Sequence, residues 1–485
     1  MGSPLSRATY DLAVIGAGAA GLTAAGAGAV LGAKTVLIEA ARFGGDCTWY
    51  GCVPSKTLLR AAAAAAEACA ADRFGIAAHL RIDGARVLAR VRAIRERIYA
   101  EADAPAVLAR YGVETLRARA HFLDPYTLAL DSDDARRTLT ARHIVIATGS
   151  RPASLDLGVP TVDTESIWDI AALPSRMLVI GGGPVAIELA QAFQRLQVAV
   201  TVIVDAPRIL ERDDPAAADI VARALRDEGV TILTQRRVRS ASDAGGIVSA
   251  TLSDGSLVRA DLVLVAVGRA ARVENLGLER AGVALRAGIV DVNRKCRTTA
   301  RHIYAAGDCA TTARFTHVAE RMAAVAVMNA IVRLPTRFDA ESVTWTTFTD
   351  PELAHVGPTE ADLRRARRRY VVQTFPFARL DRAIIDDAEP GFVSIRTTPR
   401  GRVLGATIVG PRAGESIAEV ALARARRLPV GALSATLHGY PTYALSVRRA
   451  ADIAVMRKRT PLVLAALRLF RGLRGTPPPL DALLP

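Results

Sequence analysis

The chain has 485 residues, of which 51% are hydrophobic and 23% are charged. This balance excludes a mainly disordered chain, and five cysteines over this length exclude a small disulfide-stapled scaffold. The 63 basic residues outnumber the 48 acidic ones, so composition alone leaves nucleic acid, a membrane surface and acidic ligands open as partners. Neither a membrane-spanning run nor an export signal is predicted, so we expect a cytoplasmic protein.

Residues 10–39 have the pattern of a βαβ unit with a glycine-rich turn. Its strand, turn glycines and terminal acid are, in order, Tyr10–Ile15, Gly16, Gly18, Gly21 and Glu39. Glycines at this spacing permit a tight turn, the approach of a pyrophosphate and close packing of a helix on a strand. The acid is placed to accept hydrogen bonds from a ribose. The pattern predicts a dinucleotide site, and an ordinary glycine-rich turn is the alternative.

The same design recurs at residues 176–204, which predicts a second nucleotide site. Gly181 and Gly183 open this turn, but Ala186 stands at the third glycine position. Val204 takes the position that corresponds to Glu39, with Asp205 directly after it. The loss of an acid at that position removes repulsion against a 2′-phosphate, which tilts the expectation slightly from NADH toward NADPH.

Two cysteines five residues apart, Cys47 and Cys52, lie where a helix is expected to start. A helix N-terminus stabilises a thiolate, and a thiolate held against a flavin can pass electrons on by thiol–disulfide exchange. Half of a zinc site and two buried free cysteines are the alternatives. The chain has no second cysteine pair to complete a zinc site, so no metal site is predicted.

The block GGDCTWYGCVPSK at 44–56 resembles the redox motif of the flavoprotein disulfide reductases, which include dihydrolipoamide dehydrogenase, glutathione reductase and mercuric reductase. Other segments similar to this family are ATGS at 147–150, GGGPVAIE at 181–188, VAVGR at 265–269, IYAAGDCA at 303–310 and FTDPELAHVG at 348–357. The resemblance implies an α/β fold with two Rossmann-like, three-layer nucleotide-binding domains and a C-terminal α+β dimerisation domain. It therefore implies FAD and NAD(P)H as cofactors, and a homodimer.

The domain boundaries follow from the same resemblance. We expect a discontinuous FAD-binding domain at 1–155 and 270–335, and an NAD(P)H-binding domain at 156–269. A dimer-interface domain is expected at 340–456, and a basic amphipathic tail at 457–485.

The resemblance also assigns roles to single residues. Cys52 matches the thiol next to the flavin, and Cys47 matches the interchange thiol that meets the substrate. Lys56 matches the lysine beside the flavin, Glu188 its ion-pair partner, and Asp308 the acid that binds the ribityl chain. Further cofactor contacts are expected at Gly45, Thr148, Gly149, Ser150, Gly268 and Gly307.

The C-terminal catalytic motif departs from the family. The position of the usual histidine base is Tyr440, two residues after His438, and Leu445 replaces the acid that orients the base. A tyrosine with a pKa near 10 is a poor base at pH 7, which argues against dihydrolipoamide and glutathione as substrates. A tyrosine here is similar to mercuric reductase, but no cysteine follows Cys309 to form that enzyme's C-terminal relay. His438 either replaces the missing base or is an interface residue.

These observations predict an oxidoreductase that passes electrons from NAD(P)H through FAD to a Cys47–Cys52 disulfide. The final acceptor is left open as a soft metal ion or a disulfide, met by Tyr440 of the partner subunit. The alternatives are electron transfer directly from the flavin, as in a diaphorase or quinone reductase, and a dihydrolipoamide dehydrogenase. A redox sensor is the alternative that is not an enzyme.

The remaining cysteines and the basic tail complete the expectations. Cys69 is expected to pack within a helix, and Cys296 and Cys309 to be buried. The amphipathic pattern at 457–474 fits either a peripheral contact with an anionic membrane or a helix packed on the dimer. No aromatic residues interleave with the arginines, so nucleic acid is not expected as a partner.

Overall fold

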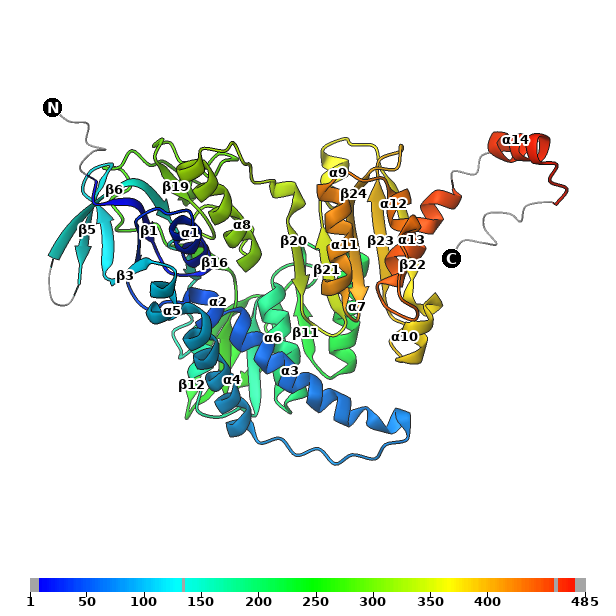
Figure 1. Cartoon of the computed structure of the whole chain (residues 1–485). Helices are drawn as coiled ribbons and strands as arrows, with labels where there is room; N and C mark the ends of the chain where they lie inside the picture. Colours follow the sequence, from blue (N-terminus) through cyan, green and yellow to red (C-terminus); the bar gives the residue numbers. More distant parts are fainter. Residues whose placement is uncertain (1–7, 133–135, 458–460, 476–485) are drawn as a thin grey trace. The chain divides into compact units, whose positions relative to one another are not determined.

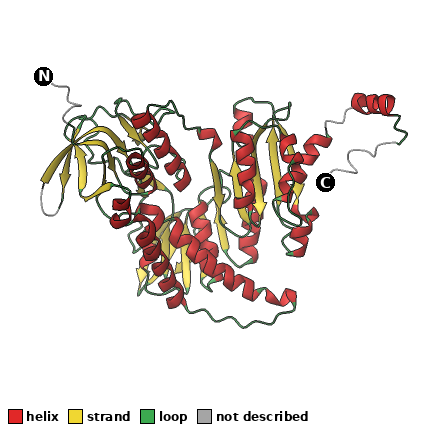
Figure 2. Cartoon of the chain, in the orientation of Figure 1, coloured by secondary structure: helices red, strands yellow, loops and turns green. Residues whose placement is uncertain are grey.

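The computed structural model describes residues 8–132, 136–457 and 461–475 (Figure 1). The chain forms two compact units, each built from both helices and strands (Figure 2). Unit 1 consists of residues 1–181, 195–199 and 238–339, and unit 2 of residues 182–194, 200–237 and 340–485. The domain boundaries expected from the sequence stay predictions.

The main sheet of unit 1 is built around β1, whose apolar side chains are almost completely buried. Burial on both faces is typical of a parallel strand covered by helices. The sheet runs in the order β3-β2-β1-β6-β5-β4, and β19 also pairs with β6. Its strands are β1 (Tyr10–Ile15), β2 (Thr35–Glu39), β3 (Val113–Arg117), β4 (Arg119–Phe122), β5 (Thr127–Asp131), β6 (Arg136–Ile146) and β19 (Ile303–Ala305).

The helices of unit 1 are α1 (Ala19–Val30), α2 (Gly45–Trp49), α3 (Cys52–Cys69), α4 (Gly84–Ile98), α5 (Pro105–Arg110) and α8 (Thr316–Val327). Helices α1, α5 and α8 pack on this sheet, and α2 and α3 carry the redox motif. Helix α1 packs on β1, β2 and α8, and α3 packs on α4. Glycine and alanine make up most of α1, which lets its backbone approach the sheet closely.

The rest of unit 1 consists of smaller strand groups. Strand β15 lies between β8 and β9, parallel to both, and β13 lies between β12 and β14, antiparallel to both. Short antiparallel pairs join β7 to β16 and β17 to β18. The bounds are β7 (Ser150–Pro152), β8 (Val162–Asp163), β9 (Arg176–Ile180), β12 (Val238–Ala244), β13 (Ile247–Leu252), β14 (Leu257–Ala260), β15 (Leu262–Val265), β16 (Arg269–Ala271), β17 (Leu285–Arg286) and β18 (Ile289–Val290).

Unit 2 joins part of the second βαβ unit to an antiparallel sheet. The first part contains α6 (Pro184–Arg195) and β10 (Ala199–Val204), for all but one terminal residue each, with α7 (Pro215–Asp227) and β11 (Thr231–Thr234). The sheet has the order β20-β21-β24-β23-β22. Its strands are β20 (Thr344–Thr347), β21 (Glu352–Val356), β22 (Val371–Pro376), β23 (Phe392–Thr397) and β24 (Val403–Gly410). The helices of its C-terminal part are α9 (Glu360–Arg365), α10 (Asp381–Ile385), α11 (Ala413–Ala425), α12 (Val430–Ala435), α13 (Leu445–Met456) and α14 (Pro461–Arg471).

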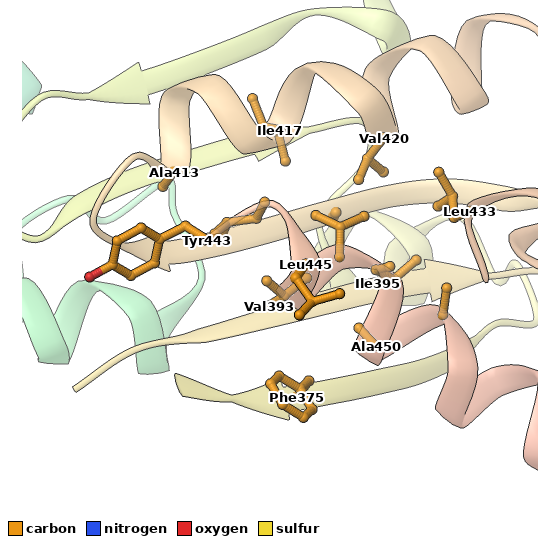
Figure 3. Close-up of a cluster of buried hydrophobic side chains, with 14 of the residues drawn as sticks. Phe375, Val393, Ile395, Ala413, Ile417, Val420, Leu433, Tyr443, Leu445 and Ala450 are labelled. Atoms are coloured by element: carbon orange, nitrogen blue, oxygen red, sulfur yellow. The ribbon is translucent and has the colours of Figure 1, made fainter. Parts of the chain in front are cut away.

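The antiparallel sheet of unit 2 is buried, and its side chains alternate as strand geometry requires. Val393 and Ile395 of β23 point into an apolar cluster to which α11, α12 and α13 contribute (Figure 3). The alternate positions carry buried polar residues instead, among them Arg396, His355 and Thr407. The Arg396 guanidinium donates to Thr407 Oγ1 over 2.9 Å, and His355 Nδ1 lies 3.0 Å from the same oxygen. Burial lowers the pKa of His355 to about 3 and that of Arg396 to about 10.

The structure can be compared with the predictions for the remaining cysteines and for a membrane-spanning helix. Cys296 and Cys309 are buried as predicted, and burial raises the pKa of their thiols to about 12 and about 11. The prediction for Cys69 is wrong: it is the last residue of α3, where the helix has left the packed interior, and it is exposed. None of the described helices is both long enough and apolar enough to cross a membrane.

Candidate functional site: a dithiol at a helix N-terminus

The two cysteines of the redox motif lie on successive short segments. Gly44 adopts a left-handed conformation with φ of 99° and starts α2, which carries Cys47. Cys52 is the first residue of α3, after Gly51. No side chain caps this helix, and no acid lies in its first turn. The positive end of the helix dipole is therefore left to favour negative charge on the Cys52 sulfur.

The sulfur atoms of Cys47 and Cys52 interact as two free thiols. The pKa of the Cys47 thiol is raised, first by its hydrogen bond with Cys52 and then by burial. The Thr316 hydroxyl at the start of α8 lies 3.5 Å from Cys52 Sγ and also hydrogen bonds with Cys47. A negative charge on the thiol pair is therefore more favourable on the Cys52 sulfur than on the Cys47 sulfur, and Cys47 keeps its proton.

Three side chains, one of them from the loop itself, fix the loop between the cysteines. The Trp49 indole donates to the Phe43 carbonyl over 2.7 Å, and the buried Arg95 of α4 donates to the Trp49 carbonyl over 2.9 Å. The Trp168 indole donates to the Tyr50 carbonyl over 2.7 Å. With both tryptophans buried, the cysteines are held in one arrangement before any ligand arrives.

A polar network connects this loop to the predicted flavin contacts. Ser150 donates to Asp308 over 2.5 Å and accepts from Arg269 Nε over 2.7 Å. The same guanidinium donates to Asp46, the residue before Cys47, over 2.7 Å. Burial raises the pKa of Asp46, and the charge of Arg269 opposes that rise. The structure thus brings Ser150 and Asp308 together with the redox loop.

Sequence reasoning missed Arg269, Asp46 and Thr316. Arg269 and Thr316 lie more than 100 residues from the contacts described above, so no local pattern reports those contacts. One indication was available: Arg269 ends the segment VAVGR directly after a buried strand. A charged residue at that position needs a partner, and the acid of the redox motif is one.

The first glycine turn leaves no room for side chains. A Cβ on Gly21 would lie 1.7 Å from the Gly16 carbonyl oxygen, and one on Gly16 would lie 2.4 Å from that of Ala147. Gly45 is equally confined, because its Cβ would lie 2.4 Å from the Gly18 Cα. Gly44 donates its N–H to the Ala17 carbonyl over 2.9 Å, which ties the redox loop to this turn.

The backbone N–H donors and the carboxylate at this turn fit the binding of a flavin dinucleotide. Gly18 is the N-cap of α1, and neither a capping side chain nor an acid occupies the first turn. Its N–H groups are thus left to bind a pyrophosphate. The Glu39 carboxylate is held by the N–H groups of Ala17 and Ala41, each at 2.7 Å, at the expected ribose position. These residues fit FAD, and Asp308 and Ser150 are predicted contacts farther along the same cofactor.

The other predicted flavin contacts lie on glycine turns of unit 1. Gly149, Gly268 and Gly307 all have positive φ, at 69°, 123° and 82°. Thr148 donates its hydroxyl to the Arg272 carbonyl over 2.6 Å. A Cβ on Gly307 would lie 3.3 Å from the methyl groups of Ala20 and Ala319, so this turn packs against both α1 and α8.

The second glycine turn is built differently. Gly181 has φ of 134°, and its Cβ would lie 2.3 Å from the Ala266 carbonyl oxygen. A Cβ on Gly182 would meet the Val204 side chain at 2.6 Å, whereas the space around Gly183 is open. Val204 is buried, and the Asp205 after it is paired with Arg237 at 2.5 Å. No ribose-binding acid stands free at this strand end.

Lys56 and Glu188 belong to different units. Lys56 lies one turn after Cys52 and lines a cavity of about 460 Å³ with Cys52, Arg60, Arg90, Ile94 and Ile98. Glu188 of α6 is buried and accepts the backbone N–H of Phe348 over 2.8 Å. Their ion pair stays a prediction.

The two C-terminal candidates have their polar atoms engaged. The Tyr440 side chain is exposed, and its hydroxyl donates to Asp381 over 2.7 Å, a hydrogen bond that raises the pKa of Tyr440. His438 Nε2 lies 2.7 Å from a Glu419 carboxylate oxygen, and its Nδ1 lies 3.0 Å from the Thr436 carbonyl. A carbonyl oxygen only accepts, so Nδ1 carries a proton and Nε2 faces an acid. This arrangement favours a structural role for His438 over that of a base.

Comparison with known proteins identifies the family. Residues 10–323 match the family model described as pyridine nucleotide-disulphide oxidoreductase, and residues 343–451 match the dimerisation domain of the same family. The chain belongs to the pyridine nucleotide-disulphide oxidoreductases. FAD and NAD(P)H are the cofactors of this family, and the dimerisation domain supports a homodimer. The predicted family, fold class and cofactors are therefore confirmed.

Several members of the pyridine nucleotide-disulphide oxidoreductases are similar over nearly the whole chain. The dihydrolipoyl dehydrogenase of Thermus scotoductus is 35% identical over 460 residues, which are 92% of this chain and 97% of the relative. The mercuric reductase of Streptomyces lividans is 34% identical over 91% of this chain and 96% of its own. The crystal structure of LpdA from Mycobacterium tuberculosis matches with a TM-score of 0.85 and 29% identity, over 91% of this chain and 99% of that one.

Proposed function

We propose that this oxidoreductase takes electrons from NAD(P)H and delivers them through Cys47 and Cys52 to a small acceptor. The observation that carries the proposal is the thiol pair itself. Cys52 lies at the uncapped, positive end of α3, and Cys47 is the thiol that keeps its proton. This division of charge suits one thiol that interacts with a flavin and one that exchanges with substrate.

With a disulfide acceptor, the exchange balances as follows. Cys47 gives its proton to the hydrogen-bonded Cys52 sulfur and attacks one sulfur of the acceptor. The S–S bond of the acceptor breaks, and its other sulfur leaves as a thiolate that takes the proton from Cys52. The Cys52 thiolate then attacks the Cys47 sulfur, which forms the Cys47–Cys52 disulfide and releases the second acceptor sulfur as a thiolate that takes a proton from water. The acceptor gains two electrons from the pair, one proton from the pair and one proton from water. Bound FAD supplies the two electrons from NAD(P)H that reduce the Cys47–Cys52 disulfide again.

A soft metal ion is the other acceptor that the pair favours. Two thiolates bind soft metals well, and the Streptomyces relative named mercuric reductase supports this chemistry. The cavity beside Cys52 is large enough for a small ligand, and its lining carries Lys56, Arg60 and Arg90.

Dihydrolipoyl dehydrogenase is the second candidate, because most of the similar curated proteins carry that name. Oxidation of a dithiol needs a base that removes its proton. Tyr440 is bound to Asp381, and both ring nitrogens of His438 are engaged. We therefore place reduction of an acceptor before oxidation of dihydrolipoamide.

Anaerobic titration of the FAD-loaded enzyme with NADPH or NADH tests the thiol mechanism. Two-electron reduction should produce a long-wavelength charge-transfer band, which Cys52→Ser abolishes. Cys69→Ser removes an exposed cysteine of the same helix and should leave the band unchanged. A wild-type enzyme without the band would overturn the proposal. Turnover with Hg(II), a small acidic disulfide and dihydrolipoamide then separates the acceptors, and rapid turnover of dihydrolipoamide establishes the second candidate.

We further propose NADPH as the preferred reductant and the cytoplasm as the location. Arg237 neutralises Asp205 at the end of β10, which removes repulsion against a 2′-phosphate. The cytoplasm keeps exposed thiols such as Cys52 and Cys69 reduced.

A further inference from the structure

Helix α14 presents an apolar surface to the solvent. Leu469 and Phe470 are 79% and 80% exposed, and Val463, Leu467 and Leu473 are also exposed. At about 100° per residue, Val463, Leu467 and Phe470 fall within about 60° of one another on one side of the helix, and Leu469 lies about 100° from Phe470. A surface of this kind marks a site of interaction, because large apolar side chains that gather in water are unfavourable.

Arginines flank the apolar side. Arg471 lies about 70° from its middle, beside Leu467, and Arg468 lies about 130° from it. Arg474 follows three residues after the helix ends. In the described part of the chain these arginines form no ion pair, and Arg468 donates only to the Gly475 carbonyl, over 3.2 Å. No Asp or Glu occurs between Asp452 and Asp481, a stretch with six basic residues: Arg457, Lys458, Arg459, Arg468, Arg471 and Arg474.

The dimerisation domain is complete without this helix. Its apolar cluster extends to Ala454 and takes none of the α14 side chains that the structure describes, Val463 to Arg471. The match to the family's dimerisation domain ends at residue 451. The tail therefore is not needed to close the core of unit 2, and its apolar side chains are available to another surface.

We propose that α14 and its basic flanks bind the surface of an anionic phospholipid membrane. The apolar side inserts at the boundary between headgroups and acyl chains, and the arginines bind phosphate groups beside it. The positive charge of the tail favours a membrane over a second copy of the chain as the binding partner. Two tails packed together would bring twelve basic residues close with no acid between them, whereas an anionic bilayer supplies the opposite charge.

Co-sedimentation of the full-length FAD-loaded dimer with vesicles tests the proposal. We expect binding to vesicles with about 30% phosphatidylglycerol, and at least about tenfold weaker binding to pure phosphatidylcholine. Truncation after Met456 should abolish pelleting. Leu469→Gln with Phe470→Gln should reduce it at least tenfold, and Arg468→Gln, Arg471→Gln and Arg474→Gln together should reduce it to the phosphatidylcholine level.

Matched variants elsewhere on the chain separate the tail from general charge and hydrophobicity. Arg364→Gln, Arg365→Gln and Arg369→Gln remove three exposed arginines, and Leu257→Gln with Leu285→Gln remove two exposed leucines. Both sets should pellet like the wild type. Equal pelleting of the truncated and full-length proteins would overturn the proposal. The proposal would also be overturned if light scattering showed that the truncated protein is a monomer. The tail would then bind a second copy of the chain and hold the dimer together.

Discussion

The two glycine turns of this chain share a spacing but not a structure. In the first, Gly21 touches the Gly16 carbonyl so closely that a methyl group would overlap it, and Glu39 is fixed by two N–H groups. In the second, Ala186 stands in place of the third glycine, and the strand end carries Val204 and a neutralised Asp205. The fixed turn fits a resident cofactor that stays bound. The more open one suits a nucleotide that must leave in every cycle.

The largest effect should come from a single methyl group in the first turn. Gly21→Ala places a Cβ 1.7 Å from the Gly16 oxygen, so the turn must open and its phosphate site is lost. We expect the ratio of flavin to protein absorbance to fall below about a tenth of the wild-type value. In the second turn, Ala186→Gly should cost about 1 kcal/mol of stability through helix propensity, with unchanged KM for the nucleotide.

Gly26→Ala is the matched control in the same helix. A Cβ at Gly26 meets nothing within 4 Å, so this variant should bind FAD fully and melt at the same temperature or slightly higher. Normal flavin content in Gly21→Ala would refute the difference between the turns.

Removal of the charge of Glu39 should weaken the first site without destroying it. Glu39→Gln replaces a carboxylate that accepts two hydrogen bonds, and each such bond is worth about 1.5–3 kcal/mol. We expect the Kd for FAD, measured by quenching of flavin fluorescence, to rise at least about tenfold. Glu67→Gln, at an exposed position of α3, should leave the Kd unchanged. An effect of the same size at both positions would mean that net charge, not the ribose contact, decides binding.

Arg237 should set nucleotide preference in the second site. Arg237→Gln exposes the charge of Asp205, which repels a 2′-phosphate, so KM for NADPH should rise about tenfold while KM for NADH stays the same. The exposed Arg239 of β12 provides the control, because Arg239→Gln removes the same charge without freeing an acid. Steady-state kinetics with both nucleotides makes the comparison. A parallel rise in both KM values would contradict the role of the pair.

An effect on stability alone, which depends on pH, lies next to α7 in unit 2. Asp213 accepts the Trp345 indole N–H over 2.7 Å, and burial raises the pKa of Asp213 to about 6. The folded state then holds the proton more tightly than the unfolded state. This carboxyl adds stability as pH falls below about 6, and the gain is lost as pH rises through 6. Asp213→Asn should flatten that slope and add about 3 kcal/mol at pH 8.

Urea unfolding at pH 5 and pH 8 measures this difference. Asp219→Asn, at an exposed position of α7, should keep the wild-type slope. A wild-type slope in Asp213→Asn would assign the pH dependence to another group.

The sequence predicted those parts of the site whose residues are close along the chain. The first turn, Glu39, and the pair Cys47 and Cys52 each follow from spacing within about 30 residues. Arg269 and Thr316 were missed because their contacts join segments more than 100 residues apart. Glu419 was missed for another reason: a single acid on a helix gives no indication that it faces His438.

The antiparallel sheet of unit 2 shows that local sequence patterns predict the fold with the same limit: they find the strands but not the contacts between them. Its strands at 392–397 and 403–410 were expected from their apolar residues, within one residue at each end. Arg396 stands in the middle of one of them, and an arginine in a strand ordinarily indicates a solvent-facing position. It is fully buried instead, because Thr407 and His355 from neighbouring strands line up with it. That alignment is a property of strand register, which local patterns do not report.

Strand β6 combines antiparallel and parallel pairing along its length. Its first residues pair antiparallel with β5, and its last residues pair parallel with β1 and β19. A slip of one residue in either half would turn every side chain of the strand to the opposite face. It would also displace the segment that follows, which carries Thr148 to Ser150. The two pairings therefore fix one common register of β6, and with it the position of the predicted flavin contacts that follow the strand.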